Sequence, residues 1–253
     1  MRRVRAHARR GAALLLVLGL VVVLGSATAT LASTARSATD GAAAMRARAT
    51  ARAMAESGIA AGQVALEALL ASGDSMALNA VALDHAAGGA LARDTLEDGV
   101  YVVAARDPGA QLDVNRADAE ALLLLFRTAM PAPVAAQVAT EIEARRAPEP
   151  GLRVRRAAFR DVDELRAVPG MTAAAFAALA PYLTVDGDES INTVTASAAV
   201  RAVAGGSLVH APTRFVLVAR GWRRGHPLTH EITVVYDVTH RDPRVLSWRE
   251  RDL

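Results

Sequence analysis

The sequence predicts an α+β fold: a long N-terminal helix, transmembrane in its first part and amphipathic in its second, packs on a small antiparallel sheet that carries an inserted all-α subdomain. Three observations predict it. An apolar stretch near the N-terminus continues into an alanine-rich, helix-favouring pattern. Segments near the C-terminus alternate between apolar and polar residues, as β-strands do. Capping and turn residues between these regions indicate short helices.

The N-terminus combines a basic tail with an apolar helix. Residues 1–10 contain five arginines and no acid, and the 25 residues Gly11–Ala35 carry no charge. About 20 apolar residues span a bilayer as a helix, and the positive-inside rule keeps the basic end in the cytoplasm. The expected membrane core is Leu14, Leu15, Leu16, Val17, Leu18, Leu20, Val21, Val22, Val23 and Leu24.

The helix is expected to continue because an alanine-rich pattern without proline extends to Ser72. We assign residues 12–35 to the transmembrane part and residues 36–72 to a continuation into a head domain; together they would be about 90 Å long at ~1.5 Å per residue. The alternative is a cleaved secretory signal, with its apolar region at Ala12–Leu24 and a small-residue cleavage site at Ala27-Thr28-Ala29.

Four of the glycines in this helical pattern have expected structural roles. Gly25 and Gly41 are expected bends or weak points. Gly58 and Gly62 are four residues apart, so they would let another element approach one face of the helix closely.

The rest of the chain is close to neutral. Without the five N-terminal arginines it has 24 basic and 26 acidic residues, so we expect no broad positive surface for nucleic acid. Cysteine is absent, and no Gly-x-Ser-x-Gly, His-Glu-x-x-His or P-loop pattern occurs. The sequence therefore predicts a protein that is not an enzyme.

The head is expected to begin at residues 73–115, with strands at Tyr101–Ala105 and Gln111–Val114 joined by the turn-forming Asp107–Ala110. Residues 116–190 are expected to form the inserted α-helical subdomain. Its expected caps are Asn115 (with Asp118), Asp161 (with Glu164) and Thr172, and its expected breaks are Pro169-Gly170 and Pro181.

Residues 191–253 are expected to complete the head with one helix and the C-terminal strands. Thr195 is the expected cap of a helix that ends near Val203, before Gly205-Gly206. The expected strands are Arg214–Trp222, Thr229–Asp237 and Val245–Arg249.

The stretch Arg9-Arg10-Gly11-Ala12-Ala13-Leu14-Leu15-Leu16 resembles the class III leader of pseudopilins, a basic stretch with a glycine just before the apolar run. The resemblance implies cleavage between Gly11 and Ala12 by a prepilin peptidase and methylation of Ala12. Leu16 stands where most such proteins have a glutamate, and the K-type minor pseudopilin of type II secretion lacks that glutamate.

Three further regions resemble general secretion pathway protein K, in the same order along the chain. They are Gly99–Val103 with Leu112–Leu122, Phe159–Gly170 with Ile191–Ser197, and the strand region ending at Val245–Glu250. That family usually has Ile-Asn-x-Asn-Thr-Ala at the second region, and Val194 replaces the second asparagine here.

The resemblance implies a minor pseudopilin that assembles at the tip of the pseudopilus for protein export across the outer membrane. The implied partners are the I-type and J-type minor pseudopilins, the prepilin peptidase and the inner membrane, with no nucleic acid. The implied location is the inner membrane, crossed once, with the N-terminus cytoplasmic and the head periplasmic.

The alternative is a membrane-anchored helix-hairpin-helix DNA-binding protein of a competence or type IV pilus-like system. Asp163–Leu183 resembles such a hairpin, which binds DNA phosphates through backbone amides. Thr172 occupies the place of the second hairpin glycine, so a packing role is the favoured interpretation. A local basic patch lies nearby, formed by Arg153, Arg155, Arg156 and Arg160.

Two groups of residues are candidate metal ligands by residue type. The loop residues Asp186, Asp188 and Glu189 are hard oxygen ligands, and calcium is known in pseudopilin heads, but the loop lacks the spacing of an EF-hand. A solvated acidic turn is the simpler interpretation. The second group is His226, His230, Asp237 and His240, which we interpret as scattered surface residues.

Overall fold

The structure is a computed structural model that describes residues 3–147, 159–240 and 242–253; for residues 3–16, 29, 31 and 32 it describes the backbone only. The chain forms two compact units, residues 1–49 and 50–253, and each is described by itself. The first unit is helical, and the second contains the sheet and the remaining helices.

Helix α1 extends from Arg3 to Ser72. It passes through Gly25 and Gly41 without a break. A glycine in a helix interior costs only about 1 kcal/mol relative to alanine, which a long helix tolerates.

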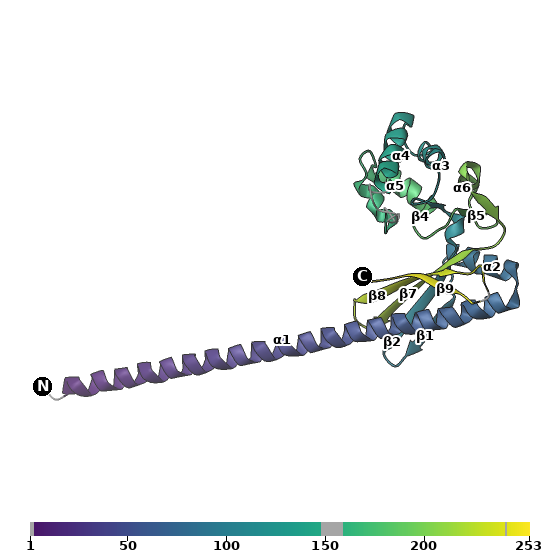
Figure 1. Ribbon diagram of the computed structural model, residues 1–253. Coiled ribbons are helices and arrows are strands. Elements are labelled where there is room, and N and C mark those ends of the chain that lie inside the picture. The colour runs from purple at the N-terminus through teal and green to yellow at the C-terminus, as the bar shows by residue number, and fades with distance from the viewer. Residues whose placement is uncertain (1–2, 148–158, 241) are drawn as a thin grey trace. The chain divides into compact units, whose positions relative to one another are not determined.

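The second unit is built on a five-stranded antiparallel sheet with the order β1-β2-β7-β8-β9 (Figure 1). Its strands are β1 (Ala92–Leu96), β2 (Gly99–Arg106), β7 (Arg214–Arg223), β8 (Thr229–Asp237) and β9 (Arg244–Asp252). The three expected C-terminal strands and the first expected strand are confirmed. Because successive side chains of a strand point to opposite faces, the sheet has two faces of different composition.

We call the face that α1 covers the helix face. Residues 50–72 of α1 pack on it, together with α2 (Ser75–Ala86). Gly58 and Gly62 provide the close approach, because a Cβ atom at either would lie 2.9–3.0 Å from the Val103 side chain. The face is apolar, with Tyr101, Val103, Ala105, Phe215, Leu217, Ala219, Ile232, Val234 and Tyr236 buried in one core. The predicted α+β fold class is thus confirmed.

Helix α2 was not predicted, although a local signal existed. Asp74 precedes it, and its carboxylate accepts hydrogen bonds from the backbone N–H groups of Met76 and Ala77 at 2.8 and 3.2 Å. An aspartate before an apolar run is a common N-cap.

The insert between β2 and β7 has its own hydrophobic core, and Figure 1 shows its helices gathered away from the five-stranded sheet. Its largest helices are α3 and α4, whose inner sides contribute Leu122, Phe126 and Ile142. In chain order the insert contains η1 (Pro108–Ala110), β3 (Leu112–Asp113), α3 (Ala119–Phe126), α4 (Ala132–Arg146), η2 (Val162–Ala167), α5 (Ala173–Leu179), η3 (Ala180–Tyr182), β4 (Leu183–Thr184), β5 (Ser190–Asn192), α6 (Ala198–Val203) and β6 (Ser207–Val209).

The expected strand at Gln111–Val114 exists only as the two-residue β3, and it does not belong to the main sheet. It pairs in parallel with β4, while β5 pairs in parallel with β6. The segment Asp107–Ala110 is a capped 3₁₀ turn that leads the chain out of the sheet.

Two expected helix caps are wrong. Asp118 occupies the N-cap of α3 in place of Asn115, and Ser197 occupies that of α6 in place of Thr195. The reason is that the side chains of Asn115 and Thr195 are engaged in long-range hydrogen bonds, to the backbone of Phe159 and to Asp107.

The insert extends beyond the expected residues 116–190, because it runs from η1 to β6 and its core includes Ile191, Ala196 and Val200. The expected helix boundaries between Asp161 and Pro181 hold, with one change of helix type. Thr172 caps α5, which ends before Pro181, as expected. Asp161 accepts a hydrogen bond from the Asp163 N–H, but the element it begins is the 3₁₀ helix η2 and not an α-helix. Glu164 accepts from the Arg160 N–H at 2.9 Å, one residue before the position that a capping box requires.

Candidate functional site

The first candidate site is the apolar segment of α1. The described large side chains from Val17 to Leu24 are all exposed, with exposed fractions of 56–63%. Among the described residues, α1 is the one helix that is long and apolar enough to cross a membrane, by length and composition. A run of exposed leucine and valine of this length needs an apolar environment.

The residues of the predicted leader lie at the start of α1. The backbone at Gly11 and Ala12 is helical, but the side chains of Ala12, Leu14, Leu15 and Leu16 lie outside the described residues. Cleavage after Gly11 and methylation of Ala12 therefore stay predictions.

The second family-like region surrounds a buried polar network. Asn192 is fully buried, and its amide donates to Asn79 and to Asp107, each at 2.8 Å. Thr195 donates to the same Asp107 carboxylate at 2.6 Å. Burial raises the pKa of Asp107, and these hydrogen bonds oppose the increase. Val194, the residue that departs from the family pattern, is 47% exposed, and only its backbone takes part: its N–H donates to Oδ1 of Asn192 at 3.1 Å.

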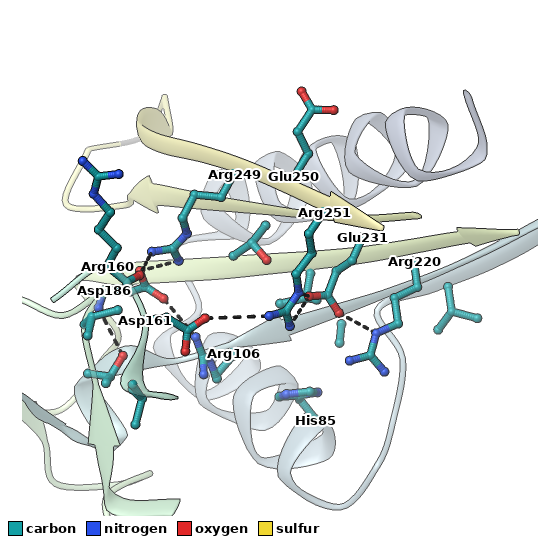
Figure 2. Close-up of a pocket in the computed structure, with 17 residues that line it drawn as sticks. His85, Arg106, Arg160, Asp161, Asp186, Arg220, Glu231, Arg249, Glu250 and Arg251 are labelled. Carbon is teal, nitrogen blue, oxygen red and sulfur yellow. Dashed lines mark hydrogen bonds and ion pairs between the residues drawn. The ribbon is translucent and has the colours of Figure 1, made fainter. Parts of the chain in front are cut away.

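The second candidate site is a charged cleft of about 560 Å³ on the sheet face opposite to α1, which we call the cleft face. Figure 2 shows it, with side chains from the sheet on one side and from the insert on the other. Its charged lining consists of His85, Arg106, Arg160, Asp161, Asp186, Arg220, Glu231, Arg249, Glu250 and Arg251.

Two buried carboxylates organise the cleft, and each binds two arginines. Asp186 accepts from Arg106 at 3.0 Å and from Arg249 at 2.6 Å. Glu231, on β8, accepts from its two cross-strand neighbours, from Arg220 on β7 at 2.6 Å and from Arg251 on β9 at 2.7 Å. Asp186 and Glu231 are 6% and 3% exposed, whereas the side chains of their arginine partners are 33–56% exposed, so the ion pairs are only partly buried.

Two nitrogen atoms in the cleft lack a partner within the described part of the chain. They are Nε of Arg106 and Nδ1 of His85, and both are buried. Buried polar atoms in native proteins usually have a hydrogen-bond partner, so unpartnered ones in a lined cavity indicate a place for a ligand or solvent. The cleft was not predicted from the sequence.

The acidic loop residues Asp186, Asp188 and Glu189 have separate surroundings. Asp186 is paired with the two arginines, whereas Asp188 accepts from the Ser190 N–H and the Thr213 hydroxyl, each at 2.8 Å. Glu189 is exposed and lines, together with Asp188, a second pocket separate from the cleft. The described residues contain no group of three or more histidines or carboxylates placed to hold a metal ion.

The second group of candidate metal ligands, His226, His230, Asp237 and His240, is likewise dispersed among separate partners. His230 bonds Asp252 at 2.7 Å and Glu250 at 3.2 Å, while Nδ1 of His226 accepts from the Leu228 N–H. Asp237 bonds Thr239, and His240 is exposed.

The predicted hairpin at Asp163–Leu183 is used in packing. Its glycine, Gly170, has a φ of +91°, and a Cβ atom there would lie 3.1 Å from Val138 and 3.4 Å from Val134 of α4. The Arg166 guanidinium lies over the Phe176 ring at 3.9 Å. Of the expected basic patch, Arg153, Arg155 and Arg156 lie outside the described residues. Arg160 lines the cleft.

The fold defines a class: an α+β head whose antiparallel sheet is covered by the end of a long N-terminal helix. Comparison with solved structures found a chain of the GspK-GspI-GspJ complex of the type 2 secretion system from enterotoxigenic Escherichia coli. The two chains are 16% identical with a TM-score of 0.49, over 74% of this chain and 96% of that chain. No protein-family model and no curated protein sequence matches the chain.

Proposed function

We propose that this protein is a membrane-anchored minor pseudopilin of the K type, which assembles at the tip of the pseudopilus of a type II secretion system. The observation that carries the proposal is the continuity of α1. One helix contains both the exposed apolar segment at residues 17–24 and the segment at residues 50–72 that is buried on the sheet. The membrane anchor and the head therefore share one element, as lateral assembly of a pseudopilin in the membrane requires.

The charge distribution supports the proposed orientation. The five arginines before the apolar segment would stay in the cytoplasm, and the near-neutral head would be periplasmic. The prepilin peptidase would then cut between Gly11 and Ala12 on the cytoplasmic side and methylate Ala12.

Two features support a place at the tip. The insert adds a second hydrophobic core to the head, and such bulk would obstruct a subunit stacked above it. Leu16 replaces a carboxylate that would be costly in the membrane unless it met a cation of a neighbouring subunit. A tip subunit has no neighbour above it and does not need that carboxylate.

The proposed action is packing and not catalysis. The partners would be the I-type and J-type minor pseudopilins, and the peptidase and the assembly ATPase would be separate chains. Calcium would bind only if Asp188 or Glu189 were completed by other oxygen ligands.

The test is the mature N-terminus. We expect the wild-type protein, expressed with a prepilin peptidase and extracted from membranes, to lose residues 1–11 and to begin at a methylated Ala12, as measured by intact-mass spectrometry. Gly11→Val should block cleavage and leave the full-length mass. Gly19→Val is the matched control, because a Cβ atom at Gly19 would meet nothing within 4 Å; it should be cleaved like the wild type.

A different mature N-terminus would contradict the proposal and favour one of the alternatives. A soluble product that begins near Thr30 would indicate a cleaved secretory signal. An uncut chain in the presence of active peptidase would favour the DNA-binding alternative, which gel-shift binding to duplex DNA at moderate salt would then establish.

A further inference from the structure

The cleft contains more positive than negative charge. Five arginines and four carboxylates line it, but Glu250 turns away toward Arg52 and His230, at 3.3 and 3.2 Å (Figure 2). Arg160 likewise points away from the other charged side chains in Figure 2, so four guanidinium groups face three carboxylates. We propose that the cleft binds a tetrahedral oxyanion of the phosphate or sulfate class, held by Arg106, Arg220 and His85.

The cleft has an excess of positive charge because pairs of arginines share one carboxylate. Asp186 and Glu231 each bind two guanidinium groups and each neutralises one charge. The triad of Asp186, Arg106 and Arg249 thus keeps one positive charge at the wall of the cleft, whereas Asp161, 3.7 Å from Arg251, balances the charge of the Glu231 triad. Guanidinium groups bind phosphate-like oxygens through charge-assisted hydrogen bonds, and they remain protonated at all physiological pH values.

The unpartnered atoms indicate where the anion would lie. Nε of Arg106 and Nδ1 of His85 are buried in this cleft with no partner among the described residues. Burial lowers the pKa of Arg106, and the charge of Asp186 opposes the decrease, so burial of this side chain disfavours the charged guanidinium. An oxyanion would supply the missing acceptor and part of the missing solvation.

His85 makes the proposed binding dependent on pH. Burial and then the charge of Arg106 lower the pKa of His85, and Arg220 lowers it further; a hydrogen bond with the Gly89 backbone and the charge of Asp84 act in the opposite direction. At neutral pH the ring is therefore uncharged and adds no further cationic donor to the two guanidinium groups. An anion would favour the protonated ring, so the two binding events are coupled and affinity should increase as the pH falls.

The experiment is a titration of the full-length protein in a neutral detergent with sodium sulfate, by isothermal calorimetry at constant ionic strength set with chloride. Sulfate keeps its charge between pH 5.5 and 8, so a change in affinity with pH must come from protonation of the protein. We expect saturable binding to the wild type, at least about five-fold tighter at pH 5.5 than at pH 8.

Three variants locate the site. Arg220→Gln should weaken binding at least about five-fold because it removes a formal charge, while Glu231 keeps Arg251 as its partner and the fold is retained. His85→Gln should bind with the same affinity at both pH values. Arg93→Gln, an exposed arginine of β1, is the matched control and should bind as the wild type does.

The proposal is overturned if sulfate gives no heat beyond that of chloride, or if Arg220→Gln and His85→Gln both bind like Arg93→Gln. Nanodiscs separate the two sources of such an anion. If the natural ligand is a lipid headgroup, phosphatidylglycerol in the disc should weaken sulfate binding by competition. If it is a free ion, the affinity should be the same in neutral and anionic discs; either result supports the site.

Discussion

The two faces of the five-stranded sheet are covered by different chemistry. On the helix face, α1 packs so closely that a Cβ atom at Gly221 would lie 2.3 Å from the Ala51 carbonyl oxygen and from the Ala55 nitrogen. On the cleft face, the sheet meets the insert across arginines and carboxylates that surround a cavity. The junction between α1 and the sheet is apolar and close-packed, whereas the junction between the insert and the sheet is ionic and contains a cavity.

The difference indicates different roles for the two junctions. Apolar contacts at van der Waals distance contain no titrating group or charge. Adding or removing atoms at such a contact lowers the stability of the fold. Ion pairs that are only partly buried respond to pH and salt and can accept a ligand. The helix face therefore fixes the anchor to the head, whereas the cleft face can adjust to its surroundings.

The largest expected effect is at Gly221. Gly221→Ala should destabilise the head by about 3 kcal/mol, because the new methyl group meets backbone atoms of α1 and one element must move. The measurement is urea-induced unfolding of the full-length protein in neutral detergent, followed by circular dichroism.

Gly58→Ala is the control on the helix side of the same junction. There the added Cβ meets only side chains, at 3.0–3.2 Å, and the helix gains about 1 kcal/mol of propensity. The free energy of unfolding of this variant should stay within about 1 kcal/mol of the wild-type value. Equal losses at both positions would show that the junction is not limited by backbone contact.

The second expected effect concerns pH. Burial raises the pKa of Asp113 to about 7, against an ordinary value near 3.8, and one oxygen of its carboxyl group is buried without a partner in the described part of the chain. The folded state therefore holds this proton more tightly than the unfolded state does. Its stabilising effect is complete below pH 4 and is lost as the pH rises through 7, with a loss of about 2 kcal/mol between pH 5 and pH 8.

Asp113→Asn isolates this effect. The amide oxygen can still accept from the Asn115 N–H, which the carboxylate binds at 2.7 Å, and no charge forms at high pH. The variant should be as stable at pH 8 as at pH 5, apart from changes that the wild type shares. Urea midpoints at the two pH values, measured with a chelator present, test it; an equal loss in both proteins would assign the pH dependence to other groups.

The strands of the sheet could be predicted because their signal is local. The alternation in Thr229–Asp237 predicted β8 to the residue, since its apolar side chains face α1. Thr172 was also predictable, because a side-chain cap bonds within one turn of its own helix.

What could not be predicted depends on distant partners. Asn115 is a good cap by type, but its amide is engaged with Phe159. The cleft is assembled from strands β2, β7, β8 and β9 and from the insert, and its composition follows from their register. Sequence spacing does not place Arg220, Glu231 and Arg251 side by side, although the register does.

The smallest expected effect tests the ionic junction itself. Asp186→Asn keeps the shape of the side chain but removes the charge that Arg106 and Arg249 share. Both guanidinium groups are about a third exposed, so water can replace part of the lost interaction. We expect a loss of about 1 kcal/mol in urea unfolding at low salt, and a smaller loss in 1 M salt.

Asp163→Asn is the matched control, because its pair with Arg166 is exposed on both sides and should contribute little. A loss at Asp186 that did not change with salt would mean that the carboxylate acts through packing. The cleft face would then resemble the helix face, and the contrast between a fixed and an adjustable junction would fail. A loss that salt reduces would instead assign the contact between insert and sheet to electrostatics, which a bound anion can change.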